Sequence, residues 1–188
     1  MFMTKIISVI SGKGGVGKTT IVSNLGCALS KRGKKVVVID GNVTGASLGV
    51  HLGVPDIQPV SLNDVLEDKA FITQALYQHP AGFMVIPAKI NDIEANLGGL
   101  KKHLGELIGK SDVILIDSAA GVSDEVKASI DVADKVLIIT NPEEAALLNA
   151  ISAKKLADKK GKDLMGVVIN NARGEKHEIT KDQVEALM

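Results

Sequence analysis

The sequence contains Ser11-Gly12-Lys13-Gly14-Gly15-Val16-Gly17-Lys18-Thr19-Thr20 between an apolar run, Ile6 to Ile10, and an amphipathic segment, Lys18 to Lys31. Glycines let backbone N–H groups turn inward around an anion, and the N-terminus of a following helix adds the positive end of its dipole. The stretch therefore predicts a phosphate-binding loop that joins a strand to a helix.

Residues Gly12 to Thr19 match the Walker A pattern, in which lysine reaches the β- and γ-phosphates and the next hydroxyl binds Mg²⁺. Lys18 and Thr19 occupy these two positions. A glycine-rich turn that binds nothing is the alternative interpretation. The expected nucleotide-binding residues of the loop are Gly12, Lys13, Gly14, Gly15, Val16, Gly17, Lys18, Thr19 and Thr20.

Short apolar runs alternate with helical patterns along the whole chain, which favours a three-layer, doubly wound, mostly parallel α/β sheet in a single domain, 1–188. The expected strands contain Ile6 to Ile10, Val36 to Ile39, Phe83 to Ile86, Val113 to Ile116, Val136 to Ile139 and Gly166 to Ile169. The expected helices are Lys18 to Lys31, Ile93 to Ile108, Ser123 to Val132 and Glu144 to Lys159, with short helices opening at Ser61 and Thr180.

Composition narrows the function classes. Aromatic residues make up 2% of the chain, so platforms on which nucleic-acid bases could stack are nearly excluded. The formal net charge is zero, so no overall field attracts nucleic acid, which is therefore an unlikely partner. Cys27 is the only cysteine, which points to a reducing compartment and cannot supply an iron–sulfur cluster. Because the first apolar run is too short for a signal peptide or membrane span, we expect a cytoplasmic protein.

At the glycine-rich loop the sequence resembles the MinD/ParA family of deviant Walker A ATPases, whose loop reads K-G-G-x-G-K-[ST]. Lys13 and Lys18 fall on the two lysines of that pattern. The resemblance implies a P-loop NTPase fold, with ATP or ADP and Mg²⁺ as cofactors. It also implies an ATP-sandwich homodimer in which Lys13 reaches the partner subunit's nucleotide. A solvated loop lysine is the other interpretation of Lys13.

Other segments extend the resemblance across the chain. Asp40 and Asp117 each follow an apolar strand, where the family's carboxylates hold Mg²⁺ through water; a helix cap or a turn is the alternative role. Gly121 resembles the family's glycine whose backbone N–H senses the γ-phosphate. Thr140-Asn141-Pro142-Glu143, at the end of an expected strand, resembles the family's T-N-P-E stretch. Asn170 resembles a residue that contacts adenine, although a turn-forming asparagine is also consistent with the sequence.

Asn42 departs from the family, which usually has an aspartate at this position to orient the attacking water. An amide can position water but cannot accept its proton, so we expect slow hydrolysis or a nearly inactive, ATP-gated binding module. The expected catalytic residues are Lys13, Lys18, Asp40, Asn42 and Asp117.

The resemblance is closest to the MinD branch, which implies a switch in the placement of the cell-division site and an activating protein partner. That branch continues beyond the equivalent of Met188 into a membrane-targeting helix, so the C-terminus looks truncated. Peripheral membrane association is expected only if such a helix exists. A ParA-type partition ATPase that binds nonspecific DNA is the alternative.

Overall fold

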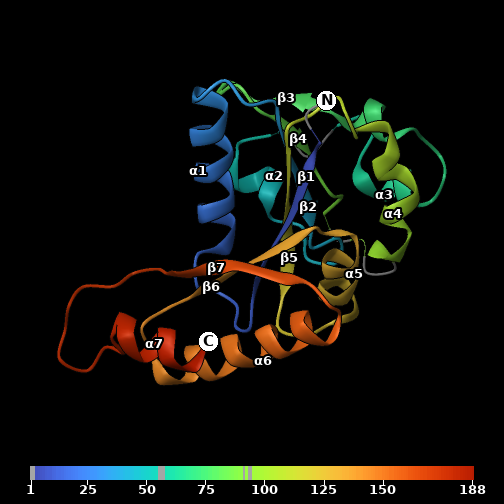
Figure 1. Ribbon diagram of the computed structural model, residues 1–188. Coiled ribbons are helices and arrows are strands. Elements are labelled where there is room, and N and C mark those ends of the chain that lie inside the picture. The colour runs from blue at the N-terminus through green and yellow to red at the C-terminus, as the bar shows by residue number, and fades with distance from the viewer. Residues whose placement is uncertain (1–2, 55–57, 91, 93–94) are drawn as a thin grey trace.

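Across residues 3–54, 58–90, 92 and 95–188, which the computed structural model describes, the chain forms one seven-stranded sheet (Figure 1). The strand order is β3-β4-β2-β5-β1-β6-β7. The strands are β1 (Lys5–Ser11), β2 (Val36–Gly41), β3 (Tyr77–Gln78), β4 (Met84–Ile86), β5 (Val113–Ala120), β6 (Lys135–Thr140) and β7 (Asp163–Ile169).

Six of these strands run parallel, and each contains or overlaps one of the expected apolar runs. The predicted doubly wound, mostly parallel sheet is confirmed. The short β3 was not expected, because two residues carry no periodic signal; it pairs antiparallel with β4 at the edge of the sheet. All six residues of β2 are buried, as a strand covered on both faces requires.

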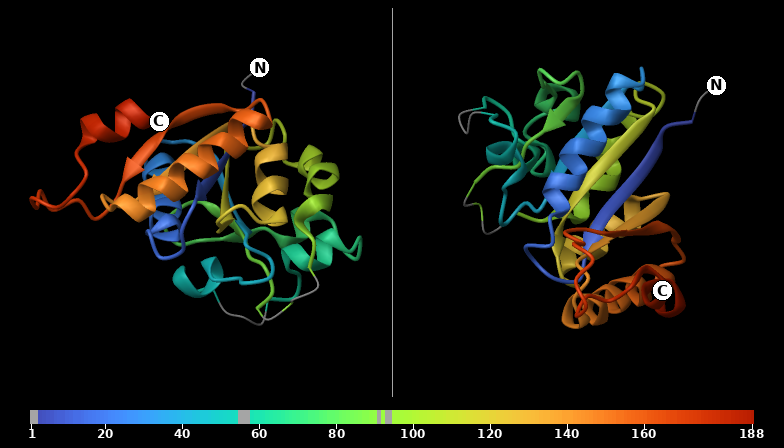
Figure 2. Two further views of the ribbon diagram at one scale, coloured as in Figure 1. Left: turned by 90° about the horizontal axis from the view of Figure 1, so that it is seen from below. Right: turned by 90° about the vertical axis from the view of Figure 1, so that its left-hand side faces the viewer.

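Helices cover both faces of the sheet (Figures 1 and 2). Helix α1 packs on one face, and α5 and α6 pack with apolar side chains of the other. The helices are α1 (Lys18–Lys31), α2 (Leu48–His51), α3 (Leu62–Leu66), α4 (Leu100–His103), α5 (Asp124–Val132), α6 (Glu144–Lys159) and α7 (Lys181–Leu187). Three 3₁₀ turns complete the described elements: η1 (Ile72–Ala75), η2 (Leu97–Gly99) and η3 (Leu104–Glu106).

Helix ends follow the predicted signals. Gly33 has a φ of 78° just after α1, a conformation that glycine adopts without strain. Ser61 and Thr180 cap α3 and α7, and each forms the reciprocal capping box with the residue three positions later. These two short helices were therefore recognisable from their first turns.

The helix expected at Ile93 to Ile108 is wrong as a single element. Residues 93 and 94 lie outside the described residues, and the remainder divides into η2, α4 and η3. Gly98, Gly99 and Gly105 lower the helix propensity of this segment, and Asn96 Oδ1 accepts a hydrogen bond from Gly98 N at 2.8 Å, as in a helix cap. Apolar spacing alone did not reveal these interruptions.

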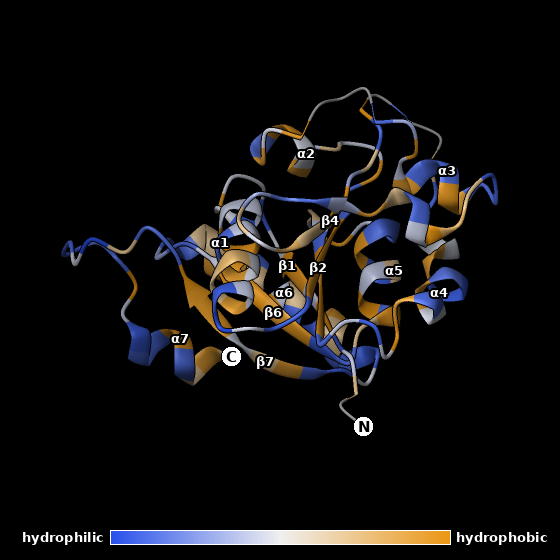
Figure 3. Cartoon of the chain, turned by 90° about the horizontal axis from the view of Figure 1, so that it is seen from above, coloured by the Kyte–Doolittle hydropathy of each residue, from blue (hydrophilic) through white to orange (hydrophobic). Residues whose placement is uncertain are grey.

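The core is almost entirely aliphatic, and the strands at the centre of the molecule are its most hydrophobic part (Figure 3). A small polar cluster lies within it. The hydroxyls of Ser8 on β1 and Ser129 on α5 lie 2.9 Å apart, and that of Ser129 lies 3.0 Å from that of Ser118 on β5. All three residues are fully buried, so the cluster fixes α5 against the sheet. No helix of the described residues is long and apolar enough to cross a membrane.

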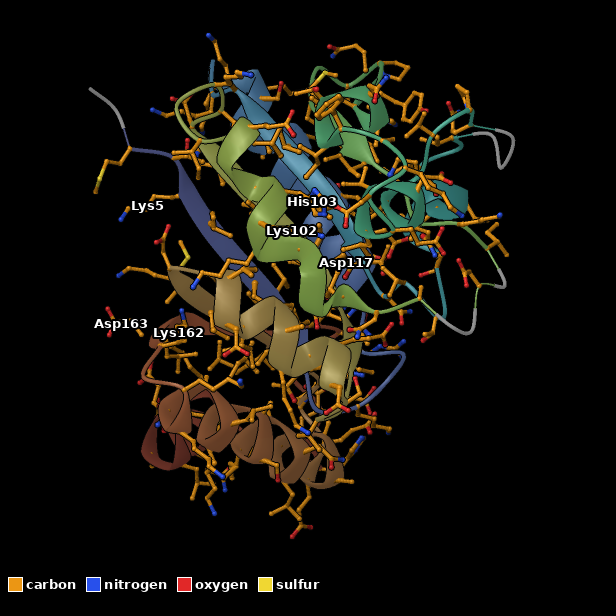
Figure 4. The ribbon with its side chains drawn as sticks, turned by 90° about the vertical axis from the view of Figure 1, so that its right-hand side faces the viewer. Lys5, Lys102, His103, Asp117, Lys162 and Asp163 are labelled. Atoms are coloured by element: carbon orange, nitrogen blue, oxygen red, sulfur yellow. The ribbon has the colours of Figure 1, made fainter. Side chains whose placement is uncertain are left out.

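The parallel arrangement brings the carboxyl ends of β1, β2 and β5 to one edge of the sheet. There Asp117 is the register partner of both Val9 and Asp40. Lys5 and Asp163, which begin β1 and β7, lie apart from Asp117 toward the opposite edge (Figure 4). Ligands of open α/β sheets bind outside the carboxyl ends of the strands, so we expect the functional site at the carboxyl ends of β1, β2 and β5.

Candidate functional site

The glycine-rich loop leaves β1 at Ser11 and enters α1 at Lys18. Gly15 and Gly17 have φ values of 77° and 91°, which a residue with a side chain rarely adopts. A pocket of about 300 Å³ lies at this turn. It is lined by Ser11, Gly14, Gly15, Val16, Gly17, Lys18, Thr19, Thr20, Asn42, Ser47 and Ala120. The structure therefore gathers the loop and the segment after β2 around one cavity.

Asp117 contacts the last two residues of the Walker A motif, Lys18 and Thr19. Its Oδ1 lies 2.8 Å from Lys18 Nζ, and its Oδ2 accepts a hydrogen bond from the Thr19 hydroxyl at 2.6 Å. The carboxylate is 1% exposed, and the Lys18 side chain is 11% exposed. In such a poorly solvated place each charge requires its partner, so these three side chains form one unit.

Asp40 is fully buried at the end of β2 and holds the segment that follows. Its carboxylate accepts hydrogen bonds from the N–H groups of Asn42 at 3.3 Å, Ser47 at 3.1 Å and Leu48 at 3.0 Å. Leu48 begins α2, so Asp40 has the helix-capping role that the sequence left open. Its role toward Mg²⁺ stays a prediction.

Burial raises the pKa of Asp40 to about 7. Loss of water is the largest cause, and the neighbouring Asp117 raises it further, while the three backbone N–H groups lower it. Two carboxylates on adjacent strand ends repel each other, and a cation between or beside them would relieve that repulsion.

Asn42 lines the pocket, but its amide is engaged within its own turn. Its Nδ2 donates to the carbonyl of Gly45 at 2.6 Å, and Gly45 N donates back to the Asn42 carbonyl at 3.2 Å. The structure thus places the unusual asparagine next to the loop, with one of its two amide N–H groups engaged by Gly45.

Asn170, which directly follows β7, forms a hydrogen bond with the glycine-rich loop. Its Nδ2 donates to the Val16 carbonyl at 2.8 Å, and a Cβ added to Gly17 would lie 2.2 Å from that nitrogen. In the orientation that satisfies its neighbours, the side-chain nitrogen of Asn141 lies 3.3 Å from the carbonyls of Val16 and Asn170. Contact of Asn170 with adenine stays a prediction, because its amide donor is directed at the loop.

Two further glycines make close contacts around the loop. A Cβ on Gly12 would lie 2.1 Å from the backbone oxygen of Asn149, so the loop packs directly on the backbone of α6. Gly121, with a φ of 81°, donates its N–H to the Ser11 carbonyl at 2.8 Å, which ties the turn after β5 to the loop. Asn149 gave no signal in the sequence, because its backbone rather than its side chain is what matters.

Lys13 points away from the pocket formed by its own chain. Its Nζ lies 3.3 Å from Glu143 Oε2 at the start of α6, and the two side chains are 48% and 56% exposed. The charge of Lys13 therefore stays accessible from solvent. The structure separates this lysine from Lys18, which lies inside the site.

The oxygen donors present suit a hard divalent cation. Mg²⁺ is usually held by one or two protein oxygens together with phosphate oxygens and water. Thr19 Oγ1 and Asp117 Oδ2, 2.6 Å apart beside the loop, provide such a pair. Among the described residues, no group of three or more His, Cys, Asp or Glu side chains could hold a metal ion alone. The fit is therefore to a metal that arrives with phosphate.

Comparison with known proteins agrees with this geometry. The ParA family model, described as "NUBPL iron-transfer P-loop NTPase", matches residues 3–184. An uncharacterized ATP-binding protein of Methanocaldococcus jannaschii is 36% identical over 191 residues, which cover 97% of this chain and 70% of that protein.

Solved structures give the same result. The septum site-determining protein MinD of Pyrococcus horikoshii, complexed with Mg-ADP, superimposes with a TM-score of 0.92 at 33% identity, covering 99% of this chain and 78% of that one. MinD of Aquifex aeolicus, in a complex with MinC, gives 0.85 at 30% identity, covering 97% and 76%.

The raised pKa of Asp40 predicts a pH-dependent stability. Its ordinary value is 3.8 and its value in the fold is about 7, so the folded chain holds the proton more tightly. The resulting stabilisation is complete below pH 3.8 and is lost as pH rises through 7, up to about 4 kcal/mol. Asp40→Asn removes the charge and keeps an acceptor for Ser47 and Leu48. We therefore expect the variant to gain stability relative to wild type between pH 5 and 8.

Urea unfolding at a series of pH values, without nucleotide or metal, measures this difference. Asp158→Asn, a change of the same chemistry at an exposed position on α6, is the control. Parallel stability curves for wild type and Asp40→Asn would contradict the assignment.

Proposed function

The chain belongs to the ParA family of P-loop NTPases, and on that premise we propose that it is an ATP-binding and ATP-hydrolysing molecular switch of the MinD type. The observation that carries the proposal is the shared contact of Asp117 with Lys18 and Thr19 beside a glycine-rich cavity. A catalytic lysine, a hydroxyl and a carboxylate at one strand end are the parts that phosphoryl transfer from a nucleotide needs.

Each residue then has a task in nucleotide binding. Lys18 leaves Asp117 and donates to the β- and γ-phosphates, while backbone N–H groups of the loop, from Gly14 to Thr19, bind the phosphate oxygens. Thr19 Oγ1 and Asp117 are the groups that would hold Mg²⁺, the hydroxyl directly and the carboxylate through water. Mg²⁺ supplies the positive charge that offsets charge developing on the phosphates.

Lys13 is proposed to act between two copies of the chain. It is exposed and held by Glu143 through a weak surface ion pair, which is worth at most about 1 kcal/mol. Little free energy therefore opposes its transfer to the phosphates of a second subunit. We therefore expect an ATP-dependent homodimer, whose mass is twice that of the monomer in ATP and returns to that of the monomer in ADP.

The biological task we propose is spatial organisation, such as placement of the cell-division site, in the cytoplasm. The support is the likeness to MinD of Pyrococcus horikoshii and to the MinD of Aquifex aeolicus that forms a complex with MinC. A protein partner that binds the dimer and accelerates hydrolysis belongs to the same proposal.

Light-scattering mass measured in Mg-ATP and in Mg-ADP tests the switch. We expect ATP to double the mass of wild type and Lys13→Ala to stay monomeric while still binding ATP. Lys176→Ala removes an equal charge from the exposed segment before α7 and should dimerise normally. A wild type that binds ATP without any change in mass would refute the proposed dimer.

A second candidate function is an ATP-gated binding module with little turnover. The observation in its favour is that Asn42, which lines the pocket, donates one amide N–H to Gly45 and, as an amide, cannot accept a proton from water.

Asn42→Asp tests how far the missing carboxylate limits hydrolysis. Single-turnover ATP hydrolysis should become at least about tenfold faster in the variant, in the range that general bases contribute. Asn24→Asp, on the exposed side of α1, is the matched control. The side-chain amide of Asn24, like that of Asn42, donates to a nearby backbone carbonyl, here that of Thr20. Equal rates for wild type and Asn42→Asp would rule out this explanation of slow turnover.

A further inference from the structure

The turn that carries Asn42 is held from outside by helix α5. Glu125 Oε1 accepts two hydrogen bonds from Thr44, one from its backbone N–H at 2.9 Å and one from its hydroxyl at 3.1 Å. The two residues are 81 positions apart in the sequence. This contact joins the segment after β2, which borders the phosphate pocket through Asn42 and Ser47, to the helix that follows β5.

Helix α5 is a firm support for such a contact. Ser129 lies in the buried hydroxyl cluster with Ser8 and Ser118, and Ser118 follows Asp117 directly on β5. At the start of the helix, Ser123 Oγ accepts a hydrogen bond from Val126 N at 3.4 Å. Glu125 lies in this first turn, where the helix dipole favours a negative charge. The acceptor offered to Thr44 is therefore fixed relative to Asp117.

Val43 anchors the middle of the turn, because its side chain is fully buried in the apolar core. The tip, Thr44 and Gly45, is held by hydrogen bonds. Asn42 and Gly45 bond to each other, and Asp40 holds the chain on either side, at Asn42 N and at Ser47 N. Among the described residues, the donors of Asn42, Thr44 and Gly45 reach one element beyond β2 and the turn, and that is helix α5, through Glu125. Thr44 and Gly45 are exposed, so water competes for this tip when Glu125 is removed.

We infer that Glu125 is a positioning residue that, through Thr44, sets where Asn42 lies in the phosphate pocket. The inference rests on the proposed ATPase function and adds a residue to it. Glu125 is not among the residues that line the pocket, so its effect falls on the orientation of water beside the γ-phosphate rather than on nucleotide binding. Its effect therefore falls on kcat and leaves KM for ATP nearly unchanged.

Three variants separate positioning from a general loss of structure. Glu125→Ala removes the acceptor, whereas Glu125→Gln keeps an oxygen that can accept both bonds from Thr44. Asp124→Ala is the matched control, because it removes one negative charge from the same helix turn and breaks only the 2.7 Å exposed pair with Lys127. Steady-state ATP hydrolysis and amide hydrogen exchange are measured on all three and on wild type.

We expect Glu125→Ala to lower kcat roughly fivefold with KM changed less than twofold, as loss of hydrogen bonds to a charged acceptor would give. Glu125→Gln should recover to within about twofold of wild type, and Asp124→Ala should match wild type. Without nucleotide, the Thr44 amide should exchange roughly tenfold faster in Glu125→Ala alone, because only that variant lacks its acceptor.

Each measurement tests a different part of the proposal: the contact between Glu125 and Thr44, its effect on Asn42, and the ATPase function itself. Unchanged exchange of the Thr44 amide in Glu125→Ala shows that the contact does not hold the turn and ends the inference. Faster exchange with unchanged kcat shows that the turn is held but does not position Asn42, which also ends it. If wild type fails to bind or hydrolyse ATP, the proposed function fails, and the exchange result still decides whether the contact exists.

Discussion

The carboxylate of Asp117 is the contact on which the site depends. It is buried at the end of β5 and shared by the Lys18 ammonium and the Thr19 hydroxyl. A buried carboxylate costs several kcal/mol unless it is paired, so the sheet can present Asp117 only where the loop supplies its partners. The reverse also holds, because Lys18 is largely shielded from water and requires an anion. Phosphate and carboxylate can replace each other as that anion.

Three loops converge on this contact because the central strands are parallel. β5 lies between β1 and β2, so the ends of all three strands meet. The pocket is bordered there by the loop after β1, the segment after β2 and Ala120 at the end of β5. Hydrogen bonds then tie the loops together: Gly121 to Ser11, Asn170 to Val16, and Thr44 to Glu125. Movement of one loop on nucleotide binding would therefore shift or break the hydrogen bonds that connect it to the others.

Features that depend on neighbours in the sequence were predictable. The Walker A spacing, the bounds of α1 and the capping boxes at Ser61 and Thr180 depend on residues close together in the sequence, and the structure has them as expected. Burial of apolar runs on both faces likewise identified the parallel strands. The broken helix between Leu97 and Glu106 was missed because glycines outweighed an apolar pattern of the right period.

Contacts between distant segments were not predictable from one sequence. Asn170 and Val16 are 154 residues apart, and the sequence indicated a ligand contact for Asn170 rather than support of the loop. Asp40 was expected to hold Mg²⁺ through water, with a helix cap as the alternative, and only the turn that follows it shows the three N–H groups that it binds. The packing of Gly12 on α6 is closest at the backbone of Asn149, which any residue type would provide, so a sequence motif does not record it.

Calorimetric titration of ADP, with and without Mg²⁺, into wild type and Asp117→Asn tests the central role of Asp117 most directly. In wild type, Mg²⁺ should tighten ADP binding at least about tenfold, because Asp117 and Thr19 hold the water ligands and the metal beside the phosphates. In Asp117→Asn, most of that gain should be lost while ADP without metal still binds through Lys18 and the loop. Equal gains from Mg²⁺ in both proteins, or no ADP binding by wild type, would contradict the assignment of the site.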